Sequence, residues 1–199
     1  MKKFELTNEF VTNMFGTKLF RIRALVEFGD VEAGELGGYV EKESNLGHDD
    51  NAWVYDNARV YGDAQVSGDA RVYGNAWVYG NALVCGNALV YDNAWVYGNA
   101  RVCGDALVCG NARVCSDEDY AYAHGFGSVN RTTTFFRLKD GGVGVRCGCF
   151  YGTLAQFRDK IRETHGETKK AQEYLMLADL MELRFEEDEN EVGNRKYVE

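Results

Sequence analysis

A six-residue pattern of apolar and polar positions dominates the centre of the chain. Each hexad reads Asn or Asp, Ala, a variable residue, Val, a second variable residue, and then Gly, Asp or Ser. Residues two apart on an extended segment point to the same side, so Ala and Val are predicted to point inward and the variable residues outward. The pattern repeats eleven times without a slip, with its valines at Val54, Val60, Val66, Val72, Val78, Val84, Val90, Val96, Val102, Val108 and Val114.

Turns are predicted between the hexads, at Gly-Asn, Gly-Asp and Asp-Asn pairs, because these residues tolerate a positive φ. A short strand with a turn every six residues cannot pair within itself, so it must stack on the next coil of a solenoid. Residues 51–117 resemble the hexapeptide-repeat family, whose fold is a left-handed parallel β-helix with three hexads per coil. One position departs from that family: the residue after the valine, often small or acidic there, is mostly Tyr or Cys here.

The resemblance implies a mainly β fold with about 3.7 coils and a rise of roughly 4.8 Å per coil. A solenoid exposes its core at both ends, so capping segments are expected. Residues 1–50 are predicted to be an N-terminal β cap with an irregular first coil. Within them, residues 18–28 alternate apolar and polar side chains as a strand does, and Val40 and Leu46 are six residues apart.

Residues 118–185 are predicted to form an α+β C-terminal cap of ββαα type. Two strand-like segments flank Lys139–Gly142 and predict a hairpin. A helix should begin after Thr153, which forms a capping-box pattern with Gln156, and should end at Gly166. The segment 171–185 is apolar on most of its helical circumference, which predicts a helix buried on several sides or docked to a partner. Residues 186–199 form an acidic tail that we expect to be flexible.

Charge and composition narrow the function classes. The net charge of -9 argues against direct nucleic-acid binding and against anionic membranes, since both need a basic surface. An apolar run of spanning or signal-peptide length is missing from the sequence, so we expect a cytoplasmic location. Four cysteines occupy variable positions of the repeat and are expected to be reduced. Cys147 and Cys149 lack a second ligand pair at zinc spacing, so we expect no metal.

Catalytic residues are not expected in this chain. Many hexapeptide-repeat proteins are acyltransferases that use acyl-CoA and a histidine base, but none of the three histidines lies within the hexads. His48 precedes the first regular coil and His124 follows the last, and the sequence does not place either beside an acceptor hydroxyl. An acyltransferase with one of them as base remains the enzymatic alternative, and we expect no cofactor otherwise.

The outward residues sort into three columns when they are read every 18 positions. One column is rich in aromatic and arginine side chains and is the first candidate binding surface: Arg59, Tyr61, Trp77, Tyr79, Trp95, Tyr97 and Arg113. A second column also carries aromatics and is the second candidate: Trp53, Tyr55, Tyr73 and Tyr91. The third column carries no aromatic residue. Trp, Tyr and Arg dominate binding hot spots, and a rigid sheet leaves them little entropy to lose.

Two other interpretations of these columns stay open. Rings on successive coils can pack on one another and stabilise the sheet without binding anything. A face can also be covered by the C-terminal helix or by a second copy, in which case the protein is a self-assembling structural β-helix or a homo-oligomer.

The chain as a whole also resembles a family carried by bacteriophages and prophages. The resemblance covers "FRIRALVEFGDVEAGELGGYVE", the hexads, "CGCFYGTLAQFRDKI" and "EYLMLADLMELRF". Some phage β-helical proteins similar to it inhibit RNA-guided CRISPR nucleases. The resemblance therefore implies a non-enzymatic anti-CRISPR protein that binds a host defence protein through one face of the β-helix.

Overall fold

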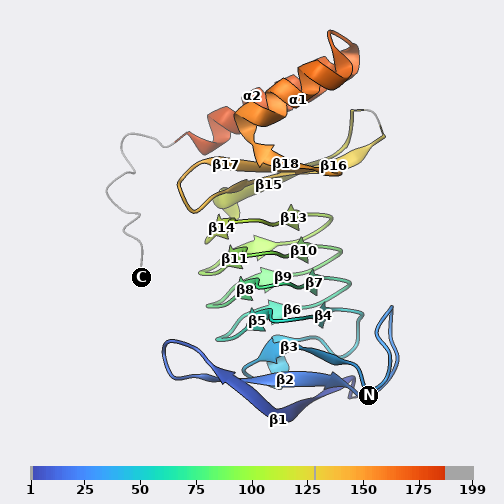
Figure 1. Cartoon of the computed structure of the whole chain (residues 1–199), viewed down its shortest axis with the longest axis vertical. Helices are drawn as coiled ribbons and strands as arrows, with labels where there is room; N and C mark the ends of the chain where they lie inside the picture. The colour runs from blue at the N-terminus through green and yellow to red at the C-terminus, as the bar shows by residue number, and fades with distance from the viewer. Residues whose placement is uncertain (1, 128, 187–199) are drawn as a thin grey trace.

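The computed structural model describes residues 2–127 and 129–186, and it shows a stack of β-coils with a lid at each end (Figure 1). Strands pair in parallel with partners 18 residues away, as Trp77 does with Trp95, so three hexads make one coil. Three sheets run along the stack, with strand orders β4-β7-β10-β13, β5-β8-β11-β14 and β6-β9-β12. The coil strands are β4 (Trp53–Val54), β5 (Arg59–Val60), β6 (Gln65–Val66), β7 (Arg71–Val72), β8 (Trp77–Val78), β9 (Leu83–Val84), β10 (Leu89–Val90), β11 (Trp95–Val96), β12 (Arg101–Val102), β13 (Leu107–Val108) and β14 (Arg113–Val114).

The repeated alanines and valines form the core of the stack. Every alanine–valine pair, from Ala52 and Val54 to Ala112 and Val114, is at most 1% exposed. The prediction that these residues point inward is therefore confirmed. The turns between hexads have a positive φ at Gly or Asp, for example 70° at Gly62 and 59° at Asp92, as predicted. The result is a β-solenoid of about four turns.

Backbone hydrogen bonds run in one direction through the stack. The N–H of each outward residue donates to a carbonyl oxygen 17 residues later, as in Trp77 to Ala94 at 2.9 Å and Tyr79 to Val96 at 3.0 Å. The first coil is left with carbonyl oxygens that no earlier coil pairs, and the last coil is left with unpaired N–H groups. The two ends of the solenoid therefore need lids of opposite hydrogen-bonding character.

The N-terminal lid, residues 2–50, supplies hydrogen-bond donors. It contains β1 (Phe4–Thr12), β2 (Lys18–Ala24), β3 (Leu36–Val40) and the 3-10 turn η1 (Glu43–Asn45), and β3 pairs in parallel with β5. The buried Asn45 Nδ2 donates to the carbonyl oxygens of Gly62 at 3.1 Å and Ala64 at 2.8 Å. Lys3 Nζ donates to the carbonyl oxygen of Ala52 at 2.8 Å. The strand predicted over 18–28 is present as β2, which ends at Ala24.

The C-terminal lid, residues 117–186, supplies hydrogen-bond acceptors. It begins with the 3-10 turn η2 (Asp117–Asp119), whose Asp117 Oδ1 accepts from the Arg101 N–H at 2.7 Å. Thr134 Oγ1 accepts from the Leu107 N–H at 2.9 Å. Phe136 is 0% exposed and belongs to the solenoid core, so it closes the apolar interior at this end.

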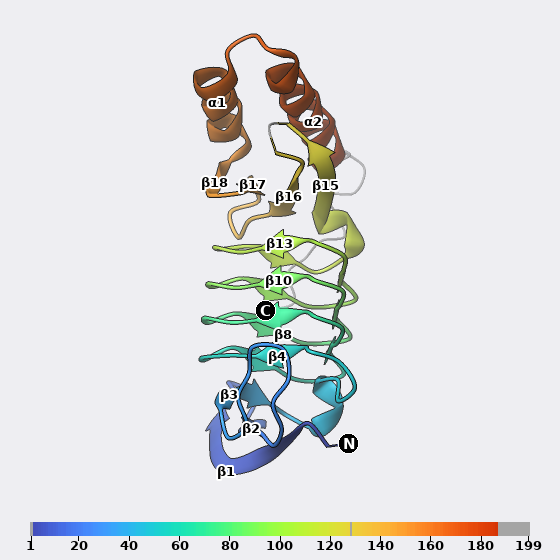
Figure 2. The ribbon, with the colours of Figure 1, turned by 90° about the vertical axis from the view of Figure 1, so that its right-hand side faces the viewer.

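Four antiparallel strands form the sheet of this lid: β15 (Tyr120–Phe126), β16 (Arg131–Arg137), β17 (Val143–Cys147) and β18 (Phe150–Thr153). The predicted hairpin is β16–β17, and β15 and β18 extend it to four strands. Two helices follow, α1 (Leu154–His165) and α2 (Lys169–Phe185), and both lie on the side of the sheet away from the solenoid (Figure 2).

The predicted ends of the first helix are confirmed. Thr153 is its N-cap and forms a capping box with Gln156, and Gly166 is its C-cap. The flexible tail predicted over 186–199 lies outside the described residues, apart from Glu186.

Candidate functional site

The first candidate column forms one continuous surface along the sheet β5-β8-β11-β14. We call it the ladder face and define it by Arg59, Tyr61, Trp77, Tyr79, Trp95, Tyr97 and Arg113. Pairing places Arg59 beside Trp77, Trp77 beside Trp95, and Trp95 beside Arg113. The column expected from the 18-residue period is thus assembled side by side, and its binding role stays a prediction.

Aromatic stacking fixes the geometry of the ladder face. The rings of Trp77 and Trp95 stack with centroids 5.1 Å apart, and those of Tyr61 and Tyr79 stack at 5.0 Å. Tyr97 continues the tyrosine stack at 5.2 Å from Tyr79. Ring faces are therefore occupied by neighbouring rings, and ring edges are left to face the solvent. Such stacking stabilises the sheet, as one of the open interpretations requires.

Arginines close the tryptophan stack at both ends. The Arg59 guanidinium lies 5.1 Å from the ring centroid of Trp77, and that of Arg113 lies 4.1 Å from the centroid of Trp95. These are cation–π contacts, which hold both side chains in place along the sheet. The centre of the face is thus a preorganised Arg-Trp-Trp-Arg row.

The row continues into the N-terminal lid, which the sequence reasoning did not anticipate. Tyr39 pairs with Arg59 in the register of β3 and β5, and the Arg21 guanidinium lies 5.4 Å from the Tyr39 ring centroid. Arg21 Nη1 also donates to Glu9 Oε1 at 3.2 Å. Tyr39 could have been found, because it precedes Val40 as each outward residue precedes a repeat valine. Arg21 carries no such signal.

Burial shortens the ladder face at its N-terminal end. Tyr61 is only 8% exposed and clusters with Leu19 and Tyr39 of the lid. The expectation that Tyr61 is an exposed contact residue is wrong, because β2 and β3 extend the same sheet and cover it. Tyr79, Trp95 and Tyr97 are half-buried and remain accessible.

The second candidate column is covered at both ends. Trp53 is 0% exposed, with Phe28 at 5.3 Å and Phe4 at 6.2 Å between ring centroids. Its assignment to an outer binding face is wrong, because the N-terminal lid folds over the first coil. At the other end, Arg146 of the C-terminal lid lies over the Tyr91 ring at 5.9 Å. Tyr55, Tyr73 and Tyr91 are half-buried, so part of the column remains accessible between the two lids.

The two candidate bases, His48 and His124, lie in different lids. His48 stacks on Phe4 at 4.5 Å, and its Nδ1 accepts from the Lys3 N–H at 3.2 Å, so it is a packing residue of the N-terminal lid. His124 is exposed on β15 in the opposite lid, with Nδ1 2.9 Å from Thr132 Oγ1. They lie at opposite ends of the stack.

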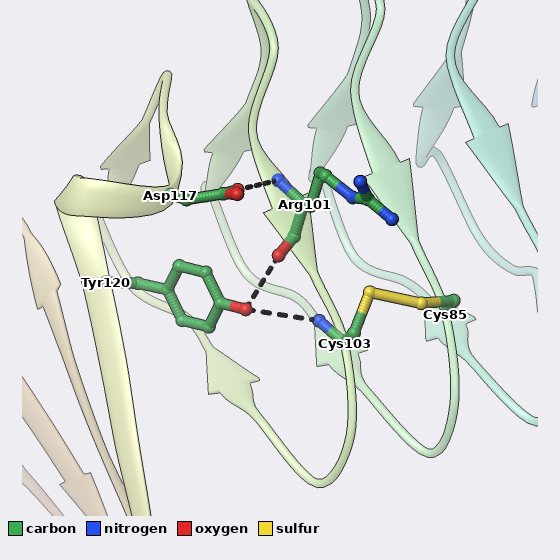
Figure 3. The surroundings of a disulfide bond; sticks show 5 residues. All are labelled: Cys85, Arg101, Cys103, Asp117 and Tyr120. Carbon is green, nitrogen blue, oxygen red and sulfur yellow. Dashed lines mark hydrogen bonds between the residues drawn. A yellow bond between two sulfur atoms is a disulfide. The ribbon is translucent and has the colours of Figure 1, made fainter.

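The third face carries a disulfide bond between Cys85 and Cys103 (Figure 3). Their expected reduced state is contradicted, because stacking brings the two Cα atoms to 4.6 Å, which suits a disulfide. The bond lies beside the C-terminal lid: Tyr120 Oη accepts from the Cys103 N–H at 3.3 Å and donates to the Arg101 carbonyl oxygen at 2.6 Å. Disulfides persist mainly in oxidising compartments, which contrasts with the expected cytoplasmic location.

The coils of the solenoid match a known repeat. The family model described as YdcK Beta solenoid repeat matches residues 52–68, 64–80, 82–98 and 94–110, each match being close to one coil in length. The chain is a β-solenoid repeat protein. All matches lie within the solenoid and none reaches either lid. No curated protein matches the chain. Among the described residues, no helix is long and apolar enough to cross a membrane.

The raised pKa values of the ladder-face tyrosines predict that the folded protein loses stability at alkaline pH. Burial raises the pKa of Tyr97 to about 12 and also raises those of Tyr61 and Tyr79, whereas a free tyrosine titrates near pH 10. Above about pH 10 the unfolded chain loses these protons while the folded chain keeps them. The contribution of these tyrosines to stability should therefore be constant below about pH 10 and should fall as the pH rises from about 10 through about 12.

An alkaline titration checks this prediction, with tyrosine ionisation followed by tyrosinate absorbance and the fold followed by circular dichroism. The expected result is that ladder tyrosines ionise only as the β signal is lost. Ionisation of all tyrosines near pH 10 with the fold intact would contradict it.

Proposed function

We propose that this protein is a non-enzymatic binding protein that uses the ladder face to dock on another protein. The observation that carries the proposal is the Arg-Trp-Trp-Arg row. Its four side chains are half-buried, and contacts with one another hold them in place. These residue types dominate binding hot spots, and their conformational freedom is already restricted by stacking. Docking would use the ring edges and the guanidinium groups, because the ring faces are occupied.

The proposed partner is a host defence protein, with an RNA-guided CRISPR nuclease as the first candidate. That choice rests on the resemblance to phage β-helical inhibitors, and so does the inference that the solenoid is left-handed. Such nucleases must move a domain into place before they cleave. A rigid binder that is selective for the undocked state shifts the equilibrium away from cleavage without any chemistry of its own. The proposed place of action is the host cytoplasm, where the Cys85–Cys103 disulfide would have to resist reduction in order to stay intact.

Replacement of both stacked tryptophans tests the proposal. The double variant Trp77→Ala, Trp95→Ala removes the centre of the ladder face. It should weaken binding to the cognate guide-loaded nuclease by at least about tenfold and should relieve inhibition of cleavage. Binding is measured by biolayer interferometry, and cleavage on a labelled target duplex, over a panel of purified RNA-guided nucleases.

A matched control uses the same hexad position on the other two faces. The double variant Leu83→Ala, Leu89→Ala should bind and inhibit as the wild type does. Inhibition that is unchanged in the tryptophan variant would exclude the ladder face. Wild-type protein that neither binds nor inhibits any member of the panel would reject the proposed partner class.

A further inference from the structure

The disulfide between Cys85 and Cys103 links two neighbouring coils on the third face. The two residues are 18 positions apart, which is one coil, so they occupy the same place on consecutive turns. Their Cα atoms lie 4.6 Å apart, close to the spacing of roughly 4.8 Å between paired strands. The regular geometry of the coils therefore suits the bond, so it can form or break without a large movement of the backbone.

The third face gives this pair no other cysteine with which to exchange. Ser67 lies one coil before Cys85, and the Tyr120 side chain of the C-terminal lid lies next to Cys103. The four other cysteines lie elsewhere, in the other two columns or in the C-terminal lid: Cys109, Cys115, Cys147 and Cys149. Thiol–disulfide chemistry on the third face is therefore confined to one pair.

The disulfide restrains the last strand of the third sheet. In that sheet β12 pairs with β9 on one side, and no strand of the described residues pairs with its other side. An end strand of this kind opens more easily than a strand that is paired on both sides. Cys85 directly follows β9 and Cys103 directly follows β12, so the bond ties the end strand to its one neighbour.

The same end strand anchors the C-terminal lid on this face (Figure 3). Asp117 Oδ1 accepts from the Arg101 N–H at 2.7 Å, and Tyr120 Oη accepts from the Cys103 N–H at 3.3 Å. Tyr120 Oη also donates to the Arg101 carbonyl oxygen at 2.6 Å. Helix α2 is tied to this junction, because Arg184 Nη2 donates to the Asp117 carbonyl oxygen at 3.3 Å. These contacts last only while β12 stays in place.

We propose that the Cys85–Cys103 disulfide is a redox latch for the C-terminal lid. When it is closed, it holds β12 against β9 and so keeps the anchor of the lid in place. When a thiol reductant opens it, β12 and the start of the lid fray while the rest of the solenoid stays folded. The redox state of the compartment then decides how firmly the lid is held. The latch lies on the third face, so it goes beyond the proposed function and does not depend on it.

The chemistry of the latch is thiol–disulfide exchange with a small thiol of the glutathione class. A thiolate of the reductant attacks one cysteine sulfur and forms a mixed disulfide, and the other cysteine leaves as a thiolate that takes up a proton. A second reductant thiol breaks the mixed disulfide, so the latch gains two electrons and two protons while the reductant becomes a disulfide. Cys85 and Cys103 are half-buried on the outer surface, and disulfides that solvent reaches are the more easily reduced ones.

Hydrogen–deuterium exchange, measured by mass spectrometry on the air-oxidised protein with and without dithiothreitol, tests the latch. Reduction should speed exchange by at least about tenfold in residues 101–104 and 117–122, because the closed loop of one coil no longer restrains them. Exchange in residues 77–79 of the ladder face should not change. Circular dichroism should keep its β signal, which shows that the opening is local.

The double variant Cys85→Ser, Cys103→Ser is the control for effects of the reductant itself. It should exchange as the reduced wild type does, with or without dithiothreitol. Cys147→Ser, Cys149→Ser removes two thiols outside the disulfide and should respond to reduction as the wild type does. Exchange in the wild type that is unchanged by reduction overturns the proposal. So does a serine variant, lacking Cys85 and Cys103, that exchanges as slowly as the oxidised wild type.

Glutathione buffers test whether the latch is reversible. Alkylation of the denatured, air-oxidised protein should label four of its six cysteines, and full reduction should expose all six. The number of labels should pass from four to six within the range of reduced-to-oxidised glutathione ratios found in cells, and should return when the ratio is reversed. Six labels in the air-oxidised protein, or four labels at every ratio, would reject a redox latch.

Discussion

Replacement of Trp53 by alanine should lower the free energy of unfolding by about 3 to 5 kcal/mol, the usual cost of removing a fully buried aromatic side chain. Trp53 is 0% exposed and is held between the first coil and the N-terminal lid by Phe4 and Phe28. Its Nε1 has no hydrogen-bond partner within the described part of the chain, so apolar packing accounts for its contribution. Urea denaturation with linear extrapolation gives the measurement.

The repeat itself provides the control. Trp77 occupies the same position of its hexad but is only half-buried on the ladder face, and Trp77→Ala should cost about 1 to 2 kcal/mol. Trp53→Phe keeps most of the packing and removes the unpaired N–H, so its cost should be less than half that of Trp53→Ala. Equal losses for the two alanine variants would show that the lid does not enclose Trp53.

Lys3→Met should destabilise the fold by about 2 to 4 kcal/mol, because it leaves backbone oxygens and a carboxylate without their donor. Lys3 is 3% exposed, and its ammonium donates to the carbonyl oxygens of Asp50 at 2.9 Å and Ala52 at 2.8 Å and to Asp50 Oδ1 at 3.1 Å. Burial lowers the pKa of Lys3 even though Asp50 opposes the shift. The structural role of this lysine is to donate hydrogen bonds to carbonyl oxygens at the start of the first coil.

Lys2, the adjacent lysine, provides the control for Lys3→Met. Lys2 forms an ion pair with Glu43 at 2.6 Å, but both side chains are about half exposed, at 50% and 46%. Lys2→Met should therefore change stability by less than about 1 kcal/mol. The same urea experiment compares the two variants, and a similar loss for both would mean that the carbonyl oxygens at this end of the stack are solvated.

The solenoid could be predicted from the sequence because one period governs it. Alanine and valine at fixed positions determine which residues point inward, and the 18-residue coil determines which outward residues become neighbours. Trp77 beside Trp95 follows from that spacing alone. The disulfide between Cys85 and Cys103 follows from it too, because these two cysteines are 18 residues apart.

The lids could not be predicted in the same way, because nothing in them repeats. Trp53 and Tyr61 obey the hexad pattern and would be outward residues on any middle coil. They are buried because Phe4, Phe28 and Leu19 arrive from segments whose partners the sequence does not specify. The pairing of Lys3 with the carbonyl oxygens of the first coil depends on the direction of the backbone, which no side-chain pattern reveals.

Because the hydrogen bonds run in one direction through the stack, the number of coils can change without any change at the two ends of the solenoid. Each middle coil accepts from the coil before it and donates to the coil after it, so a new coil of 18 residues would leave both ends chemically unchanged. The donor lid and the acceptor lid would still meet the groups for which they are built. Length can therefore be altered in whole coils to set the span of the ladder face, while neither terminus needs to be redesigned.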